Sequence, residues 1–231
     1  MSNYLLGINI LIIKSTIRTM PFELSFVDFL DYAGTFAFAI SGIRLASEKN
    51  FDLFGAYIVG WATACGGGTI RDLFLNMSPF WMTQWVYLVI TGVALVCYMF
   101  WYKFINHISG TIFLFDAIGL ALFAVVGFQK TIEAGFPLWT ANIMGMCTGA
   151  IGGVIRDILI NEVPLIFRRD IYALACIFGG LVFSLAYVMD VPNFLCQILC
   201  AVSVFTVRVL AVHYHWQLPL LHDEGDDKSA Q

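Results

Sequence analysis

Charged residues are scarce in this sequence, and their scarcity defines its class. Asp, Glu, Lys and Arg make up only 12% of the 231 residues, whereas a soluble domain carries about 25%. Hydrophobic residues make up 60%, and the mean hydropathy is +0.83. This composition excludes an ordinary soluble domain and predicts an all-α, polytopic membrane protein with a single domain. The sequence contains no block of basic residues, so nucleic acid is not an expected partner.

Residues that hold metals or perform covalent catalysis are also sparse. The six cysteines all lie in apolar runs and none forms a CxxC pair, so they are expected to behave as small apolar residues. His213 and His215 stand alone near the end of an apolar segment, whereas a metal site needs clustered ligands. The sequence has no nucleophile–base pair and no phosphate-binding loop. It therefore predicts no disulfide, no metal, no cofactor and no enzymatic activity.

Long apolar segments are abundant instead. Seven are near the roughly 20 residues that a helix needs to cross a bilayer, and they cover residues 28–45, 53–75, 85–104, 111–129, 138–160, 171–189 and 193–213. Together they define a transmembrane domain over residues 27–213. Residues 1–26 are predicted to be an interfacial extension, because the apolar run Leu5–Ile13 is too short to span. Residues 214–231 form a polar, acidic tail.

One unit of sequence occurs twice, at a constant offset of 85 residues. Gly66-Gly67-Gly68-Thr69-Ile70-Arg71-Asp72 corresponds to Ile151-Gly152-Gly153-Val154-Ile155-Arg156-Asp157, and Asp31 corresponds to Asp116. Repeat one therefore covers residues 28–104 and repeat two residues 111–189, while the seventh segment has no partner. Because each repeat crosses the membrane three times, an odd number, the repeats are expected to have inverted topology, as in many transport proteins.

Glycines interrupt the second and fifth apolar segments at corresponding places. They are Gly66, Gly67 and Gly68 in the second segment and Gly149, Gly152 and Gly153 in the fifth. Each glycine costs a helix about 1 kcal/mol relative to Ala, and broken helices in lipid occur only beside protein or a water-filled cavity. We predict glycine-kinked helices whose freed carbonyls line a pore, with Thr63, Thr69 and Thr148 as further oxygen donors. The alternative is close helix packing through small residues.

Six charged side chains are candidates for intramembrane charges, and they lie in the first, second, fourth and fifth apolar segments. They are Asp31, Arg71 and Asp72 in repeat one and Asp116, Arg156 and Asp157 in repeat two. A charge at the bilayer centre costs roughly 2.5–3.5 kcal/mol, so these groups must face protein or water. Two interpretations stay open: an ion-pair lock that holds the broken helices, and charges along a permeation path. Because neighbouring residues on a helix point about 100° apart, we expect Arg71 to pair across the pseudo-dyad, or with Asp31 or Asp116, rather than with Asp72.

Lys and Arg are distributed unevenly among the short loops. With the N-terminus outside, the inner side receives Arg44, Lys49, Lys103, Arg168, Arg169, Arg208 and Lys228, and the outer side receives Lys14, Arg18 and Lys130. The positive-inside rule therefore predicts a multi-pass protein of the cell (inner) membrane, with its N-terminus outside and its C-terminus in the cytoplasm.

The two copies of the motif, Gly66 to Asp72 and Gly152 to Asp157, resemble those of the trimeric intracellular cation channel (TRIC) family in its prokaryotic branch. The resemblance extends from about Val27 to about Val212. It implies seven transmembrane helices, a homotrimer, and one pore inside each protomer that passes K⁺ and, less selectively, Na⁺. It also implies that the second and fifth helices are kinked at their glycines. Close bacterial relatives are described as glycine transporters.

Three functions are therefore considered. The first is a passive channel for monovalent cations, in which K⁺ is the permeant ion and not a cofactor. The second is a secondary transporter of glycine or another small amino acid, and the third is a structural membrane oligomer without a pathway. The paired glycine segments and the intramembrane charges argue against the third, whereas broken helices serve both of the others. The expected partners are further copies of the chain and membrane lipid.

Overall fold

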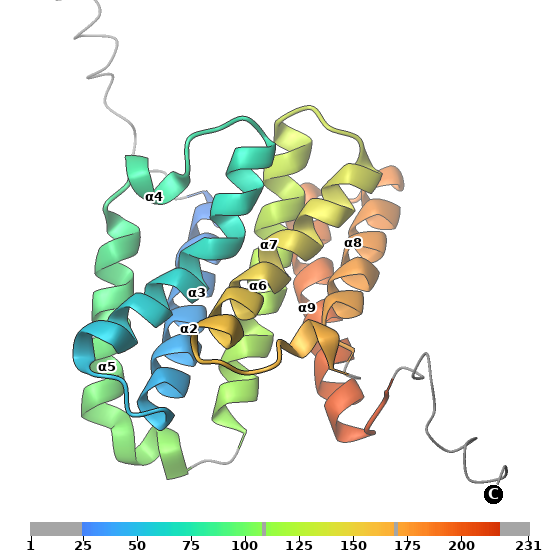
Figure 1. Cartoon of the computed structure of the whole chain (residues 1–231). Helices are drawn as coiled ribbons and strands as arrows, with labels where there is room; N and C mark the ends of the chain where they lie inside the picture. The colour runs from blue at the N-terminus through green and yellow to red at the C-terminus, as the bar shows by residue number, and fades with distance from the viewer. Residues whose placement is uncertain (1–24, 108–109, 169–170, 218–231) are drawn as a thin grey trace, which may run out of the picture.

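The computed structural model describes residues 25–107, 110–168 and 171–217, and the regular elements in these ranges are all helices. In chain order they are α2 (Phe26–Glu48), α3 (Leu53–Phe74), α4 (Phe80–Thr83), α5 (Val86–His107), α6 (Thr111–Glu133), α7 (Leu138–Leu159), the 3₁₀ helix η1 (Leu165–Phe167), α8 (Ala173–Val188) and α9 (Asn193–His213) (Figure 1). The seven longer helices confirm the predicted all-α membrane fold. The short elements α4 and η1 were not predicted. The predicted interfacial extension and most of the acidic tail lie outside the described residues.

The two triplets of helices run in opposite directions, as the odd number of crossings predicted (Figure 1). Repeat one consists of α2, α3 and α5, and repeat two consists of α6, α7 and α8. Helix α3 terminates at one end of the bundle and its counterpart α7 terminates at the other (Figure 1). These two ends are called the α3 end and the α7 end below.

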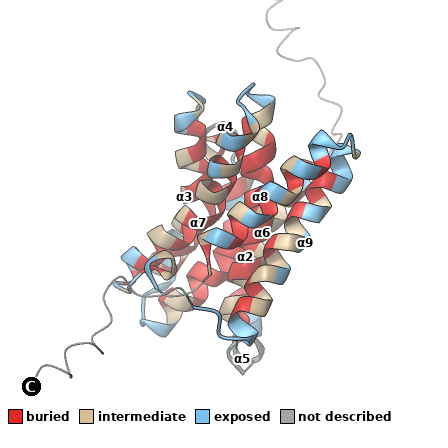
Figure 2. Ribbon diagram, turned by 90° about the vertical axis from the view of Figure 1, so that its right-hand side faces the viewer, coloured by how far each residue is buried: buried red, intermediate tan, exposed pale blue. Residues whose placement is uncertain are grey.

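Helices α2, α3, α6 and α7 form the centre of the bundle, and α5, α8 and α9 lie around them (Figure 2). The packing follows the pseudo-two-fold axis. Phe38 meets its counterpart Phe123 edge to face, with ring centroids 5.2 Å apart. Each ring covers a glycine of the other repeat, because Gly34 contacts Phe123 and Gly119 contacts Phe38. Small residues at these positions therefore let α2 and α6 approach each other closely.

Six helices of the described residues are long and apolar enough to cross a membrane. Helix α8 has only 16 residues, which gives about 24 Å of rise, somewhat less than the ~30 Å hydrocarbon thickness. The outer faces of the peripheral helices are apolar, and α5 exposes Val89, Val93, Val96 and Phe100. Such a surface is unfavourable in water and suited to lipid.

The predicted breaks at the glycines are wrong. Helices α3 and α7 are each continuous over 22 residues, through Gly66–Gly68 and through Gly149–Gly153. Non-helical backbone angles occur instead in α5, at Trp101 (φ −103°, ψ 18°). Glycine weakens a helix by only about 1 kcal/mol, whereas a backbone group left without a hydrogen bond in hydrocarbon costs several. Both helices therefore stay intact despite their glycines.

Candidate functional site

Helices α3 and α7 cross at their glycines, at the centre of the molecule. A methyl group on Gly67 would overlap the carbonyl oxygen of Thr148, and one on Gly152 would overlap the carbonyl oxygen of Thr63. Because 67 corresponds to 152 and 63 to 148, the crossing is symmetric about the pseudo-dyad. The absence of a side chain at both glycines is what lets the two backbones touch, as the packing interpretation predicted.

The remaining glycines of the two motifs also lie at contacts between elements. Gly66 faces the side chain of Ile155, and Gly68 faces the ring of Phe80. In the other repeat, a methyl group on Gly149 would lie 2.9 Å from the carbonyl oxygen of Leu120. Gly66, Gly67 and Gly152 therefore lie at the crossing of α3 and α7, whereas Gly68 packs on α4, Gly149 on α6 and Gly153 on Tyr172. The carbonyls of these glycines stay within continuous helices.

The three predicted threonines lie on the same helices, and each hydroxyl donates to the carbonyl one turn earlier. The distances are 2.6 Å from Thr63 to Val59, 2.7 Å from Thr148 to Met144, and 2.7 Å from Thr69 to Cys65. Thr63 and Thr148 are fully buried. Their hydroxyl hydrogens are used within the helix, so their oxygens keep lone pairs as potential acceptors.

A cluster of charged groups lies at the α3 end. The Arg71 guanidinium contacts Asp72, with Nε 2.8 Å from Oδ1, while Nη1 has no partner among the described residues. Asp31 instead binds Lys130 of α6 at 2.7 Å and accepts a hydrogen bond from Tyr87 at 3.1 Å. Arg71, Asp72 and Asp31 are all buried. Two carboxylates and two cations balance here, so the charges of this cluster compensate one another.

A second cluster lies at the α7 end, and its arginine is more fully bound. Arg156 contacts Asp116 at 2.6 Å and Asp157 at 2.9 Å, and it donates to Ser41 at 2.8 Å. Tyr172, the counterpart of Tyr87, donates to Asp116 at 3.4 Å. Arg156 thus joins both repeats, because Ser41 belongs to α2.

Each Asp of the Ile-Arg-Asp motif also fixes the chain that follows its helix. Asp72 Oδ2 accepts from the Phe80 backbone N–H at 2.9 Å, and Asp157 Oδ2 accepts from that of Leu165 at 3.0 Å. The prediction that Arg71 would not pair with Asp72 is wrong. An arginine side chain is long enough to turn back to the adjacent carboxylate, although the two Cβ atoms diverge. The contacts favour the ion-pair lock for these residues.

Several residues of the clusters were missed from the sequence. Tyr87 and Tyr172 are equivalent by the offset of 85, and that correspondence was the available signal. Lys130 is a lone cation in an apolar helix. Arg208 of α9 donates to the Ile171 carbonyl at 2.8 Å. Helix α9 has no counterpart in the repeats, so no signal in the sequence indicated that Arg208 contacts repeat two.

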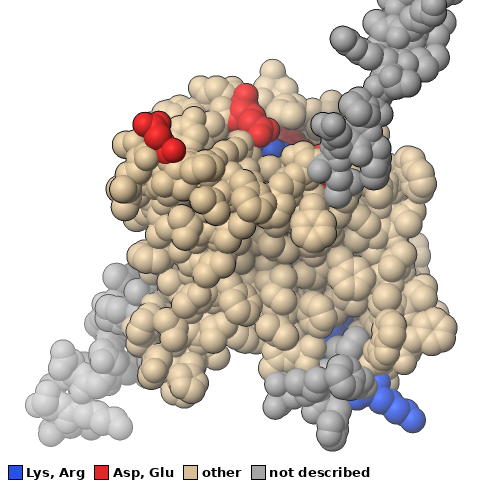
Figure 3. Space-filling view, turned by 180° about the vertical axis from the view of Figure 1, so that it is seen from behind, with Lys and Arg blue, Asp and Glu red and all other residues tan. Residues whose placement is uncertain are grey.

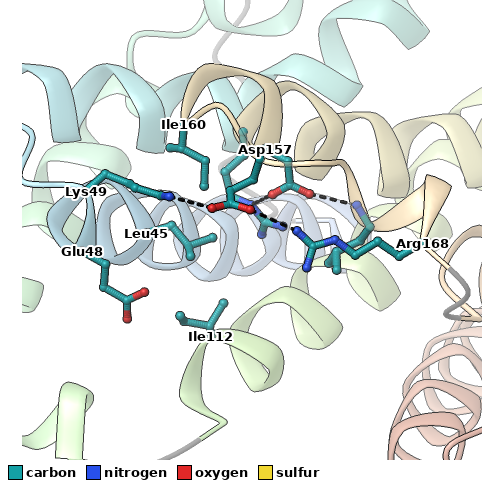
Figure 4. Close-up of a pocket in the computed structure, with 10 residues that line it drawn as sticks. Leu45, Glu48, Lys49, Ile112, Asp157, Ile160 and Arg168 are labelled. Carbon is teal, nitrogen blue, oxygen red and sulfur yellow. Dashed lines mark hydrogen bonds and ion pairs between the residues drawn. The ribbon is translucent and has the colours of Figure 1, made fainter.

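A pocket of about 410 Å³ opens at the α7 end (Figure 4). Its lining includes the buried Arg156 and Asp157, and Lys49, Glu162 and Arg168 lie at its rim. Lys49 Nζ lies 2.6 Å from Glu162 Oε1. This hydrogen bond and the charge of Lys49 hold the pKa of Glu162 below its usual value, so the carboxylate is ionised at neutral pH.

Among the described residues, exposed Lys and Arg lie at the α7 end and not at the α3 end, although the α7 end also carries Glu48, Asp52 and Glu162. On the face in Figure 3, Asp and Glu lie at the α3 end beside a cation, and further Lys and Arg side chains lie at the α7 end. Exposed cations at the α7 end include Lys49, Lys103 and Arg168. The asymmetry has the sign that the positive-inside rule requires if the α7 end faces the cytoplasm.

These features define a polytopic helical membrane protein built from an inverted repeat, with a buried ion pair at each end. A family model described as "Glycine transporter" matches residues 28–103 and again residues 113–188, which are the two repeats. The "UPF0126 inner membrane protein YadS" of Escherichia coli (strain K12) is 38% identical over 196 residues, covering 84% of this chain and 95% of that protein. The "UPF0126 membrane protein YvgT" of Bacillus subtilis (strain 168) is 35% identical over 195 residues, covering 83% and 95%.

Solved structures match over a similar length. A TRIC cation channel superposes with a TM-score of 0.77 at 34% identity, covering 86% of this chain and 98% of that chain. A TRIC channel orthologue from Rhodobacter sphaeroides superposes with a TM-score of 0.75 at 32% identity, covering 82% and 98%. The chain therefore belongs to the TRIC family, in its prokaryotic branch, as the motifs predicted. The matched structures are ion channels and not enzymes.

Proposed function

We propose that the protein is a passive channel for monovalent cations, which conducts K⁺ and, less selectively, Na⁺. The observation that carries the proposal is the match to a TRIC cation channel over 86% of the chain at 34% identity. The inverted repeat and the buried charges in each half support it, because a duplicated unit of this kind is typical of transport proteins.

We assign the pathway to the interior of one protomer, through the crossing of α3 and α7. The backbones touch at Gly67 and Gly152, so the crossing is closed in this conformation. A small separation of the two helices uncovers the carbonyl oxygens of Thr63 and Thr148, which lie at the crossing. Oxygens of this kind replace the hydration shell of an alkali cation. In this proposal, the motif glycines form the contact at which α3 and α7 separate, and the pathway opens without a break in either helix.

The proposal includes assembly and placement. The protein forms a homotrimer in the cell (inner) membrane, surrounded by lipid, with its N-terminus outside and its C-terminus in the cytoplasm. The exposed cations of the α7 end support this orientation. The inner-membrane name of the relative YadS supports the location.

A second candidate is secondary transport of glycine or another small amino acid. The description of the matching family model favours it, and inverted repeats serve transporters as well as channels. A transporter opens its site to one side of the membrane at a time, whereas a channel needs a pathway that is open at both ends at once.

Reconstitution into liposomes separates the two candidates. A K⁺ gradient and a radiolabelled glycine gradient are imposed in parallel on one preparation, with protein-free liposomes as the control. We expect K⁺ flux that rises linearly with the gradient and little glycine uptake. Saturable glycine uptake without K⁺ flux would favour the transporter instead.

A further inference from the structure

Three exposed side chains bridge the mouth of the pocket at the α7 end. Glu162, in the turn after α7, binds Lys49, the residue that follows α2, at 2.6 Å. Its second oxygen lies 3.4 Å from Nη2 of Arg168, which follows η1. These residues, called the strap below, join the end of repeat one's first helix to the end of repeat two's second helix.

The strap and the buried cluster of the α7 end line one pocket (Figure 4). The same pocket is lined by Lys49, Glu162 and Arg168 at its rim and by Arg156 and Asp157 further in. Arg156 in turn contacts Asp116 and Ser41 in the interior. A group entering the protein from this end must therefore pass the strap before it reaches the buried charges.

The pseudo-symmetry of the molecule sets the strap apart. The deep ion pairs and the turns after α3 and α7 occur in both repeats. At the α3 end, however, the positions equivalent to Lys49, Glu162 and Arg168 by the offset of 85 are Ala134, Met77 and Thr83. None of these three carries a charge, so the strap is not a consequence of the duplicated fold.

The ion pairs of the strap are weak enough to break readily. The side chains of Lys49, Glu162 and Arg168 are each 41–43% exposed, and ion pairs with this exposure contribute little to stability and weaken as salt rises. A weak link between two helix ends can break without disturbing the buried cluster further in. The remaining charged residue of the pocket rim, Glu48, faces Arg44 of its own helix at 3.4 Å and not the strap.

We propose that the strap is a salt-sensitive gate that narrows the mouth of the pathway at the α7 end. This proposal rests on the proposed cation-conducting function. Breaking the Lys49–Glu162 bond lets the end of α2 and the turn after α7 separate. The mouth of the pocket then widens, and ions reach the Arg156 cluster more readily. A rise in ionic strength on this side favours the open mouth, because it screens the strap.

The first test measures access to the pocket and needs no flux. Ile112 of α6 lines the pocket and is partly buried, so Ile112→Cys is labelled with a membrane-impermeant methanethiosulfonate in the full-length protein, with the parent chain as background. Adding Glu162→Gln is expected to speed labelling about two- to fivefold, the range that the loss of an exposed ion pair supports. Glu48→Gln is the matched control and should leave the rate unchanged.

The salt dependence gives an independent readout on the same proteins. With the strap intact, labelling of Ile112→Cys should accelerate as KCl rises, and with Glu162→Gln this dependence should disappear. Equal rates and equal salt dependence with and without Glu162→Gln would overturn the gate. A rate that increases equally with Glu48→Gln would also overturn it, because the effect would then belong to the net charge of the rim.

The second test joins the strap to transport. Lys49→Cys with Glu162→Cys is treated with a reducible bis-methanethiosulfonate cross-linker in liposomes, with each single variant as a control. Cross-linking is expected to reduce K⁺ flux, and reduction should restore it. Unchanged flux in the cross-linked protein would overturn the gate. If the wild-type protein carries no K⁺, the proposed function fails, while the labelling test still decides whether the strap narrows the mouth of the pocket.

Discussion

At the scale of single residues, the arginines of the two repeated motifs, Arg71 and Arg156, contact unequal numbers of carboxylates. Arg156 compensates both Asp116 and Asp157, whereas Arg71 contacts Asp72 and leaves Asp31 to Lys130. A buried carboxylate left without its cation is costly, at about 3–5 kcal/mol for one broken pair. The loss of Arg156 therefore exposes more uncompensated charge than the loss of Arg71.

We expect Arg156→Ala to lower the free energy of unfolding by about 3–5 kcal/mol and Arg71→Ala to lower it less. Thermal unfolding in detergent measures both. Arg168→Ala is the control, since Arg168 is exposed and should shift stability by no more than about 0.5 kcal/mol. Wild-type stability in Arg156→Ala would show that the guanidinium faces water and does not lock the fold.

The turn after each motif helix depends on one asparagine. Asn76 and Asn161 have φ of 56° and 58°, a left-handed conformation that ends a helix and suits Gly or Asn. The backbone N–H of the next residue closes the turn on Asp72 in one case and on Asp157 in the other, each at 2.8 Å.

Asn161→Ala should therefore destabilise the protein by about 1–2 kcal/mol, because a β-carbon is strained at this φ. Asn161→Gly removes the strain and should stay close to wild type. Chemical denaturation in mixed micelles compares the two. If the alanine and glycine variants unfold at the same denaturant concentration, the left-handed backbone is not what the asparagine supplies.

At the scale of the helices, glycine serves contact and not flexibility. Gly67 and Gly152 lie where the backbones of α3 and α7 touch. A methyl group at either position must push the helices apart, since a carbonyl oxygen cannot move aside as a flexible side chain can. The same substitution at an open helical position is harmless.

We expect Gly67→Ala and Gly152→Ala each to lower stability by about 1–3 kcal/mol, the usual cost of overpacking, and the double variant to lose K⁺ flux. Gly92 of α5 is the matched control, because no atom lies within 4 Å of the methyl group that Gly92→Ala adds. That variant should be unchanged or slightly stabilised, since alanine favours a helix. Melting temperature and flux are measured on one preparation. A stable double alanine variant with wild-type flux would remove these glycines from the pathway.

The sequence predicted the helices well because their signals are local or repeated. Apolar length located the spans, and the offset of 85 exposed the inverted repeat. The prediction of breaks at the glycines was wrong because helix propensity does not include the cost of unpaired backbone groups in lipid. The prediction that Arg71 would not pair with Asp72 was wrong because Cβ directions do not limit the reach of a long side chain. The strap joins residues 113 positions apart, and no spacing in one sequence reveals such a contact.

At the scale of the whole molecule, the proposed orientation follows from the uneven distribution of exposed Lys and Arg between the two ends. A C-terminal reporter that is active only in the cytoplasm tests it. We expect activity, because the α7 end carries the exposed Lys and Arg residues and helix α9 terminates there. Replacing Lys49, Lys103 and Arg168 by Gln should weaken this bias. An expressed but inactive wild-type fusion would reverse the assigned orientation.

Conduction by the whole protein is tested most directly by the reversal potential in a planar bilayer. Purified protein is reconstituted under a tenfold KCl gradient, and single-channel currents are recorded while glycine is added to either side. A cation channel produces discrete unitary currents that reverse near the K⁺ equilibrium potential, about 59 mV from zero, and that ignore glycine. A bilayer that contains protein yet shows no unitary current, while the same preparation takes up glycine saturably, would contradict the channel and establish the transporter.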